Sequence, residues 1–193
     1  MPSAYPLLYR FGFTPWTSRT ENPMLDRLLD QLPAGRAIDL GCGTGGDVVR
    51  MAQRGWDVVG VDGVAQPLRT ARERASAAGV SPVFRQGDVT KLAELVPGEV
   101  FDLVHYAGCF HGLNSKERQA CADGINAITR PGAHLLLLAA SPRRGLGPNG
   151  ADSDDLLRYL GPDWTLDESV DTGAPAPRGP LKGVHFYWHH LHR

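Results

Sequence analysis

Short apolar runs alternate along the chain with stretches in which apolar residues recur at helical spacing. The apolar runs predict buried strands at 37–40, 56–61, 83–86, 101–106 and 133–140. The helical spacing predicts helices at 22–32, 47–54, 67–78, 114–128 and 153–160. Two later runs, 164–170 and 184–192, alternate in polarity and predict a closing antiparallel strand pair. This order indicates an α/β fold with a Rossmann-like, doubly wound, mainly parallel seven-stranded sheet covered by helices.

Residues typical of element ends sharpen some of these boundaries. Asn22 directly before a proline is typical of a helix N-terminus, and Asn114 with Glu117 three positions later matches a capping box. We expect Pro131-Gly132 to turn the chain into the strand at 133–140, and Ser153 to cap the last helix. The stretch 171–183, rich in glycine and proline, predicts a loop that is either disordered or part of a binding site.

Length and composition fit one soluble domain. The chain has 193 residues, 42% of them hydrophobic, which is ordinary for a single globular core. Within that single domain, 1–193, we distinguish an N-terminal segment and helix at 1–35, a cofactor-binding core at 36–140, and a C-terminal helix and strand pair at 141–193. A net charge of −1 gives no electrostatic footprint for nucleic acid.

Several classes of protein are disfavoured by what the sequence lacks. No run of about 18 apolar residues suggests a membrane span, and the first residues lack the basic start and apolar core of a secretion signal. The cysteines, Cys42, Cys109 and Cys121, are odd in number and have no CxxC spacing, which argues against a disulfide framework and a cysteine-zinc site. A cytoplasmic location is the simplest expectation.

A glycine-rich turn between a predicted strand and a predicted helix is the first candidate for chemistry. Glycines let the backbone approach a ligand, and the following helix offers its N–H groups. Gly41, Gly43 and Gly46 match the dinucleotide pattern G-x-G-x-x-G. Asp39, Gly41, Gly43 and Gly45 also match D-x-G-x-G-x-G, which resembles motif I of class I methyltransferases. The glycines alone leave both interpretations open.

Acidic residues at other strand ends favour the second interpretation. Asp62 fits both, because it stands about 20 positions on, where an acid binds ribose hydroxyls. Asp39 favours S-adenosylmethionine, which ends in an ammonium group and carries no pyrophosphate. Asp88 follows the third predicted strand, where a methyltransferase commonly has an acid near the adenine. The sequence has no Tyr-x-x-x-Lys of a short-chain dehydrogenase and no Gly-Lys-Ser/Thr of a Walker loop.

Most of the chain resembles the thiopurine, thiol and halide methyltransferases and related small bacterial methyltransferases. The segment 11–16, Phe-Gly-Phe-Thr-Pro-Trp, looks like the family's G-x-T-P-W segment, which implies a lid over the cofactor with Trp16 near its methionine end. The stretches 41–50, 55–62, 84–88 and 101–104 look like the family's cofactor strands. The chain departs from the family at Thr17, where the family often has aspartate, and at Tyr106, another frequent aspartate position. The segment Gly108-Cys-Phe-His111 is closer to the small bacterial relatives.

These observations assign S-adenosyl-L-methionine as the cofactor and predict which residues hold it. The predicted cofactor-binding residues are Trp16, Asp39, Gly41, Cys42, Gly43, Asp62, Gly63, Asp88, Val89 and Tyr106.

On the acceptor side, His111 is the candidate general base or acceptor-orienting residue, because it follows the fourth predicted strand and histidine titrates near neutral pH. A histidine hydrogen-bonded within a loop is the alternative. His105 lies inside that strand and is expected to belong to the core. Tyr106 and Cys109 are expected in the pocket wall.

Further polar residues are candidates for the lid and for the acceptor side. Tyr9 and Arg10 are candidates for the lid, and residues 143–144, both arginine, could attract an anionic acceptor, although solvated side chains are the simpler expectation. Strand alternation places His185 and His189 on one face and His190 and His192 on the other, without a carboxylate to complete either set. We therefore expect no metal site.

The sequence thus predicts an S-adenosylmethionine-dependent methyltransferase that acts on a small molecule by in-line methyl transfer. The acceptor could be an aromatic or heterocyclic O, N or S, or a small thiol or halide. Expected partners are this acceptor only, with no nucleic acid and no membrane, for a monomer or homodimer. The alternatives are an S-adenosylmethionine-binding module, or a protein methyltransferase without small-molecule turnover.

Overall fold

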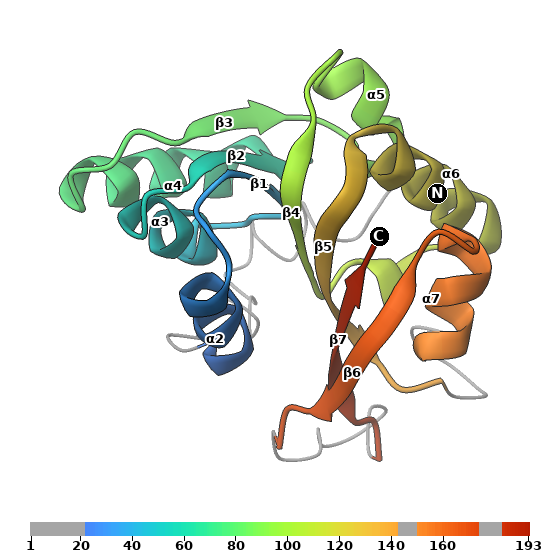
Figure 1. Ribbon diagram of the computed structural model, residues 1–193. Helices are drawn as coiled ribbons and strands as arrows, with labels where there is room; N and C mark the ends of the chain where they lie inside the picture. Colours follow the sequence, from blue (N-terminus) through green and yellow to red (C-terminus); the bar gives the residue numbers. More distant parts are fainter. Residues whose placement is uncertain (1–21, 143–149, 174–182) are drawn as a thin grey trace. The chain divides into compact units, whose positions relative to one another are not determined.

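The computed structural model describes residues 22–142, 150–173 and 183–193 (Figure 1). Its strands and helices follow the predicted alternation. In chain order they are α2 (Pro23–Gln31), β1 (Arg36–Leu40), α3 (Gly46–Gln53), β2 (Asp57–Asp62), α4 (Ala65–Ala77), β3 (Val83–Gln86), α5 (Leu92–Leu95), β4 (Phe101–Ala107), α6 (Ser115–Ala127), β5 (Thr129–Ala140), α7 (Ser153–Leu160), β6 (Thr165–Asp171) and β7 (Phe186–His192). Two short 3-10 turns, η2 (Val89–Lys91) and η3 (Phe110–Gly112), and α5 were not predicted.

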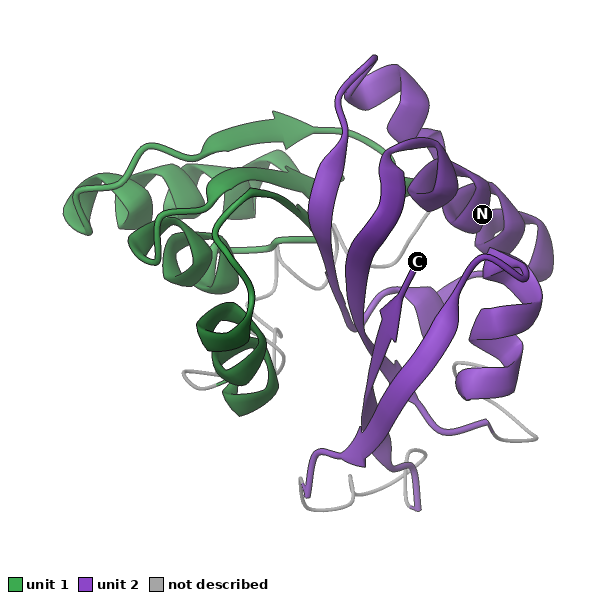
Figure 2. Ribbon diagram, in the orientation of Figure 1, with its two compact units in different colours: residues 1–89 green, residues 90–193 purple. Residues whose placement is uncertain are grey.

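The chain divides into two compact units, residues 1–89 and 90–193 (Figure 2). In the first unit the strand order is β3-β2-β1, and both strand pairs are parallel. In the second unit the order is β4-β5-β7-β6. There β4 and β5 are parallel, whereas β7 runs antiparallel to both β5 and β6. The predicted antiparallel pair at the end of the chain is therefore confirmed.

Close packing in the first unit explains a glycine in the middle of β2. A Cβ on Gly60 would lie 2.9 Å from the Phe84 ring, closer than real Cβ atoms come, and 3.0 Å from the Cys42 sulfur, which is tighter than most real Cβ contacts. Only glycine therefore lets the side chains from β3 and from the turn after β1 close over β2. The sulfur of Cys42 thus belongs to the packing of this unit.

Charged side chains connect α2 with α3 in the first unit. Arg50 of α3 and Arg54, which directly follows that helix, each lie 2.7 Å from the carboxylate of Asp26 on α2. The side chain of Asn22 caps α2 by accepting from the Leu25 amide at 3.2 Å, as predicted, and its Nδ2 donates to Asp47 at 3.4 Å. These contacts hold α2 next to the helix that follows the glycine-rich turn.

The centre of the second unit is β5, whose residues 135–140 are all buried. The expectation that Pro131-Gly132 precedes this strand is wrong, because β5 begins at Thr129 and includes both residues. The pairing of β4 with β5 shifts between Phe101 and Leu103, and Gly132 adopts a φ of 87°. An irregularity within a strand therefore accommodates residues whose sequence is typical of a turn.

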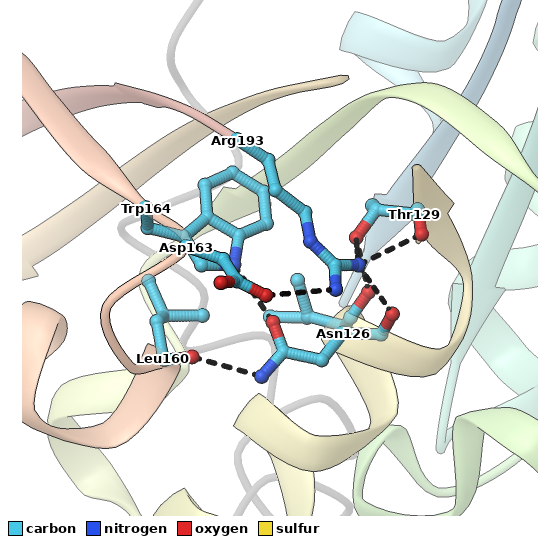
Figure 3. Close-up of polar contacts among 7 residues, drawn as sticks. Asn126, Thr129, Leu160, Asp163, Trp164 and Arg193 are labelled. Atoms are coloured by element: carbon cyan, nitrogen blue, oxygen red, sulfur yellow. Dashed lines mark hydrogen bonds and ion pairs between the residues drawn. The ribbon is translucent and has the colours of Figure 1, made fainter. Parts of the chain in front are cut away.

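Arg193, which follows β7, joins three elements of the second unit (Figure 3). Its guanidinium donates to the carbonyl oxygens of Asn126 at 2.6 Å and Thr129 at 2.8 Å, and lies 3.4 Å from the Asp163 carboxylate. The Asn126 side chain in turn accepts from Trp164 Nε1 at 2.7 Å and donates to the Leu160 carbonyl at 2.9 Å. This cluster satisfies carbonyl groups at the ends of α6 and α7.

Of the two helix caps predicted in the second unit, the structure confirms one and contradicts the other. The capping box of Asn114 and Glu117 at the start of α6 is present in full. The assignment of Ser153 as the cap of α7 is wrong, because Asp152 occupies that position and accepts from the Asp155 amide at 2.9 Å. Both residue types favour helix N-caps, so the sequence does not distinguish between these two neighbours.

Over the described part of the chain, no helix combines the length and apolar character that a bilayer span requires.

Candidate functional site

Three parallel strands of the first unit end at the same edge of its sheet. They end at Leu40 in β1, Asp62 in β2 and Gln86 in β3. Ligands of open α/β sheets bind outside the carboxyl ends of the strands. Six of the predicted cofactor residues lie between positions 39 and 63, at the ends of β1 and β2, and two more, Asp88 and Val89, follow β3.

The turn after β1 depends on glycine at three positions. Gly41, Gly43 and Gly45 have φ of 73°, 53° and 73°, in the region that favours glycine. A Cβ on Gly45 would also meet the Ala71 Cβ of α4 at 2.8 Å. The repeated D-x-G-x-G-x-G pattern therefore has a conformational cause at each of its glycines.

Asp62 fixes this turn through both carboxylate oxygens. Oδ2 accepts from the Gly43 amide at 2.9 Å, and Oδ1 accepts from the Val64 amide at 2.8 Å. The side chain is buried, with 7% of the residue exposed. A carboxylate has about four lone-pair positions, so two amides leave it able to accept further donors such as ribose hydroxyls.

A second buried carboxylate, Asp39, stands at the start of the same turn. Its residue is 3% exposed, and in the sheet it pairs with Gly60 of β2. Burial raises the pKa of Asp62, the amides of Val64 and Gly43 lower it, and the charge of Asp39 adds to the rise. Two neighbouring buried acids make this edge of the sheet favourable for a cationic ligand and unfavourable for an anionic one.

The remaining predicted residues of the first unit differ in what they can contribute. The Cys42 side chain packs toward Gly60 and its amide donates to the Val61 carbonyl at 2.9 Å, so its contact with a ligand is limited. Gly63 accepts from the Gln86 side chain at 3.3 Å, which connects the ends of β2 and β3. Asp88 is exposed directly after β3, and Val89 begins η2.

Tyr106 and His111, the remaining described candidates, belong to the second unit. Tyr106 is fully buried near the end of β4 and meets the Phe110 ring edge-on at 6.2 Å. Cys109 is only partly buried and its sulfur lies 3.9 Å from the Ala107 carbonyl. His105 is 1% exposed and packs on Trp188 at 5.5 Å, which confirms that it is a core histidine.

His111 is held from two sides within η3. Its Nδ1 accepts from the Ala140 amide at 3.4 Å, and its carbonyl accepts from Arg118 at 3.2 Å. Burial, followed by the charge of Arg118, lowers the pKa of His111 to about 4. At neutral pH the ring is therefore uncharged, and with Nδ1 accepting, its proton lies on Nε2.

Sequence reasoning missed Arg118, the residue that organises this loop. The arginine is 6% exposed and its guanidinium donates to the carbonyls of Leu113, His111 and Gly150, the last at 2.6 Å. It also lies 5.3 Å from the centre of the Phe110 ring. Its helix position gave no signal, because an arginine one turn into a helix is usually solvated.

Several predicted residues lie outside the described part of the chain. They are Tyr9, Arg10 and Trp16 of the predicted lid, and Arg143 and Arg144. Their proposed roles stay predictions.

The histidines of β7 lie as strand alternation predicted, with His190 and His192 on one face and His189 on the other. His189 is 3% exposed and its Nδ1 lies 2.7 Å from the Ser169 hydroxyl, so it belongs to the packed part of the sheet. The premise that no face combines histidines with a carboxylate is wrong. His190 and Asp167 lie 3.5 Å apart, because β6 brings Asp167 next to β7.

Comparison with known proteins identifies the family. Residues 37–132 match the methyltransferase domain family. Thiocyanate methyltransferase 1 of Brassica oleracea is 34% identical over 131 residues, which are 66% of this chain and 57% of that protein. The ubiquinone biosynthesis O-methyltransferase of Hahella chejuensis is 40% identical over 118 residues, or 59% of this chain and 48% of that protein. The chain thus spans about half the length of these relatives.

The solved structures show the same fold. A 1,6-didemethyltoxoflavin-N1-methyltransferase of Burkholderia thailandensis, solved with S-adenosylhomocysteine, is 22% identical with a TM-score of 0.74. The match covers 98% of this chain and 85% of that one. The predicted fold class, seven strands in a mainly parallel Rossmann-like sheet with antiparallel strands at the end, is confirmed. Through the match over residues 37–132 and the similarity to these relatives, the chain belongs to the class I S-adenosylmethionine-dependent methyltransferases.

Proposed function

We propose that the protein transfers a methyl group from S-adenosylmethionine to a small-molecule acceptor. The observation that carries this proposal is the pair of buried carboxylates, Asp39 and Asp62, at the glycine-rich turn. S-adenosylmethionine presents an ammonium, a sulfonium and ribose hydroxyls to such a site, whereas a dinucleotide would present the anionic pyrophosphate. Opposite charge stabilises buried carboxylates in their ionised form, so the site favours the cationic cofactor.

The residues at the three strand ends fit distinct parts of this cofactor. Asp62 would accept the ribose hydroxyls through the lone pairs that its two amide contacts leave available. The resemblance assigns Asp39 to the ammonium group, Asp88 to the adenine amino group and Trp16 to a lid at the methionine end. The bound cofactor supplies an activated methyl group, and the protein aligns the acceptor with it, which can contribute about 7–11 kcal/mol in favourable cases.

His111 fits an orienting role better than that of a general base. A base works best with a pKa near the working pH, whereas burial and Arg118 lower the pKa of His111 to about 4. Its Nδ1 accepts from Ala140, so Nε2 carries a proton that can be donated to the acceptor. We therefore propose His111 as a hydrogen-bond donor that positions the acceptor.

This role favours acceptors that need no base at neutral pH. Thiolates, thiocyanate, halides and acidic hydroxyls are already anionic or weakly protonated, and an Nε2–H donor can hold them. The similarity to a thiocyanate methyltransferase supports this class. The similarity to a ubiquinone biosynthesis O-methyltransferase is the reason to test hydroxyl acceptors as well.

Calorimetry with S-adenosylhomocysteine tests the cofactor assignment. We expect Asp62→Asn to weaken binding by at least about tenfold, because the substitution removes the charge and one acceptor oxygen. Asp57→Asn is the matched control, since Asp57 begins the same strand and pairs with Arg36 at its opposite end. Binding of a nicotinamide dinucleotide in place of S-adenosylhomocysteine would overturn the proposal.

Turnover is tested with a panel of thiols, thiocyanate, halides, phenols and heterocycles, assayed for S-adenosylhomocysteine release. We expect the anionic acceptors to react best. With the best of these acceptors, His111→Gln should reduce kcat by about 10²-fold and leave the affinity for the cofactor unchanged. Cofactor binding without turnover on any member of the panel would favour a binding module or a protein methyltransferase. Unchanged kcat in His111→Gln would remove His111 from the mechanism.

A further inference from the structure

Two histidines and an aspartate from three adjacent strands converge on one face of the second unit's sheet. They are His134 of β5, Asp167 of β6 and His190 of β7, the strand between the other two. One ligand atom from each lies within 4.8 Å of the others. This cluster has no part in the proposed methyl transfer.

The strand register places both histidines on the same face. His134 is directly opposite His192, and Leu136 is directly opposite His190, across the antiparallel β5–β7 pair. Opposite residues of an antiparallel pair point to the same side, and residues two apart on one strand share a face. His134, His190 and His192 therefore project together, and the diagonal pair His134–His190 is within reach of two imidazoles.

Asp167 lies on the same face, beside a β-bulge in β6. Thr165 pairs with His192, so strand alternation places Asp167, two residues further along, on the face of His192 and His190. Leu166 pairs with Leu191 and Glu168 pairs with His190, so Asp167 and Glu168 together oppose His190 at the bulge. Bulges of this kind are frequent next to functional sites.

The distances approach those between ligands that share one ion. Nδ1 of His134 and Nε2 of His190 are 3.0 Å apart, and the two rings stack with centroids at 5.2 Å. Tetrahedral zinc with bonds of about 2.0–2.1 Å separates its ligand atoms by about 3.3 Å. Asp167 Oδ2 lies 3.5 Å from Nδ1, the other nitrogen of the His190 ring, while its Oδ1 is held by His192 at 2.7 Å. With one ligand atom from each residue, the three atoms lie within 4.8 Å of one another.

We propose that His134, His190 and Asp167 bind a divalent transition-metal ion of the zinc type. Imidazole nitrogens with one carboxylate are typical ligands of zinc and its neighbours in the first transition row, whereas magnesium and calcium prefer oxygen ligands alone. The longest distance between two of the three ligand atoms is at most 4.8 Å, so it has to shorten by at most about 1.5 Å for both to bind one ion. Rotation of the exposed Asp167 side chain can supply this change.

His192 positions the carboxylate. Its contact with Asp167 Oδ1 leaves Oδ2 directed at His190, and partners of this kind orient metal-binding side chains. Three protein ligands leave one tetrahedral position for water. The ion would connect β5, β7 and β6, and so stabilise the antiparallel part of the sheet.

Titration of the full chain with Zn²⁺ tests this site without any measurement of methyl transfer. We expect one Zn²⁺ per chain, a higher thermal unfolding midpoint with Zn²⁺, and no response to Mg²⁺. His134→Gln, His190→Gln and Asp167→Asn should each weaken Zn²⁺ binding by at least about tenfold. Co²⁺ bound in place of Zn²⁺ should give the visible absorption of a tetrahedral site, which the same variants lose.

The control is His185→Gln. His185 is an exposed histidine 3.3 Å from an aspartate, Asp171, and within the described residues it belongs to no such cluster. We expect its Zn²⁺ affinity to equal that of the parent chain. Should a histidine variant fail to fold, Asp167→Asn changes only an exposed side chain and gives the answer alone. Absence of saturable Zn²⁺ binding, or equal affinity in the parent and in Asp167→Asn, would overturn the proposal.

Discussion

Single side chains in this protein differ in function because their surroundings differ. Asp62 is a buried acid that accepts two backbone amides and shares its environment with Asp39, so it both holds the turn and suits a cationic ligand. His111 is a histidine whose surroundings keep it neutral and fix the nitrogen that carries its proton. In both cases the residue type indicated a range of possible roles, and the neighbouring groups determine which of these roles the side chain can have.

The state of His111 predicts a pH dependence of stability. Its pKa falls from 6.5 to about 4 on folding, so the unfolded chain takes up a proton in a range where the folded chain does not. The stability that His111 contributes is therefore complete above about pH 6.5 and decreases as the pH falls toward 4, by as much as about 3 kcal/mol. Urea unfolding of the parent and of His111→Gln between about pH 6.5 and 4 should show that the free energy of unfolding decreases less in the variant.

The exposed His185 provides the comparison. Replacing it by glutamine removes a histidine whose side chain is 54% exposed, and this variant measures what removal of an exposed imidazole alone does to unfolding. A His111→Gln variant that loses stability on acidification as steeply as the parent would show that the ring is not kept neutral by burial.

At the scale of elements, two kinds of contact determine how helices meet strands. The glycine-rich turn lets α4 pack against it because Gly45 has no Cβ. In the second unit, Asn126 connects α6 with the end of α7 and with Trp164, just before β6. Both contacts can be removed by one substitution.

Gly45→Ala should destabilise the protein more than a glycine substitution with the same backbone conformation in open space. At Gly45 the new Cβ meets Ala71 at 2.8 Å, whereas at Gly79, with φ of 70°, nothing lies within 4 Å. The left-handed conformation costs about 1–2 kcal/mol in both, and overpacking adds about 1–3 kcal/mol at Gly45 alone. Urea unfolding of Gly45→Ala and Gly79→Ala measures the difference, and equal losses would contradict the packing argument.

Asn126→Ala should reduce the free energy of unfolding by about 2–3 kcal/mol, because it removes a partner from the buried Trp164 Nε1 and from the Leu160 carbonyl (Figure 3). Asp123→Ala, an exposed position on the same helix, should change it by no more than about 0.5 kcal/mol. Denaturant unfolding monitored by tryptophan fluorescence compares the two. Similar effects at both positions would show that the Asn126 contacts add little.

For the whole molecule, cofactor binding should appear as stability. At a hundredfold excess over its Kd, S-adenosylhomocysteine should raise the free energy of unfolding by about 2.7 kcal/mol and the midpoint by about 5–10 °C. Thermal unfolding of the full chain measures this shift, and Asp62→Asn should reduce it. A shift with a nicotinamide dinucleotide and none with S-adenosylhomocysteine would contradict the family assignment.

Local sequence patterns were enough to predict the order of the main strands and helices, the fold class and the cofactor, because strand and helix periodicities and the D-x-G-x-G-x-G turn depend on residues close together in the chain. Prediction from the sequence failed where two neighbouring residues suit the same position, as with Ser153 and Asp152. It also failed where a pair typical of a turn, Pro131-Gly132, lies within β5. Only the tertiary structure showed that Arg118 is buried against His111, that Gly60 makes room for Phe84, and that the pairing of β6 with β7 places Asp167 beside His190. Such contacts join residues far apart in the chain, and their geometry depends on strand register and packing, which no local pattern contains.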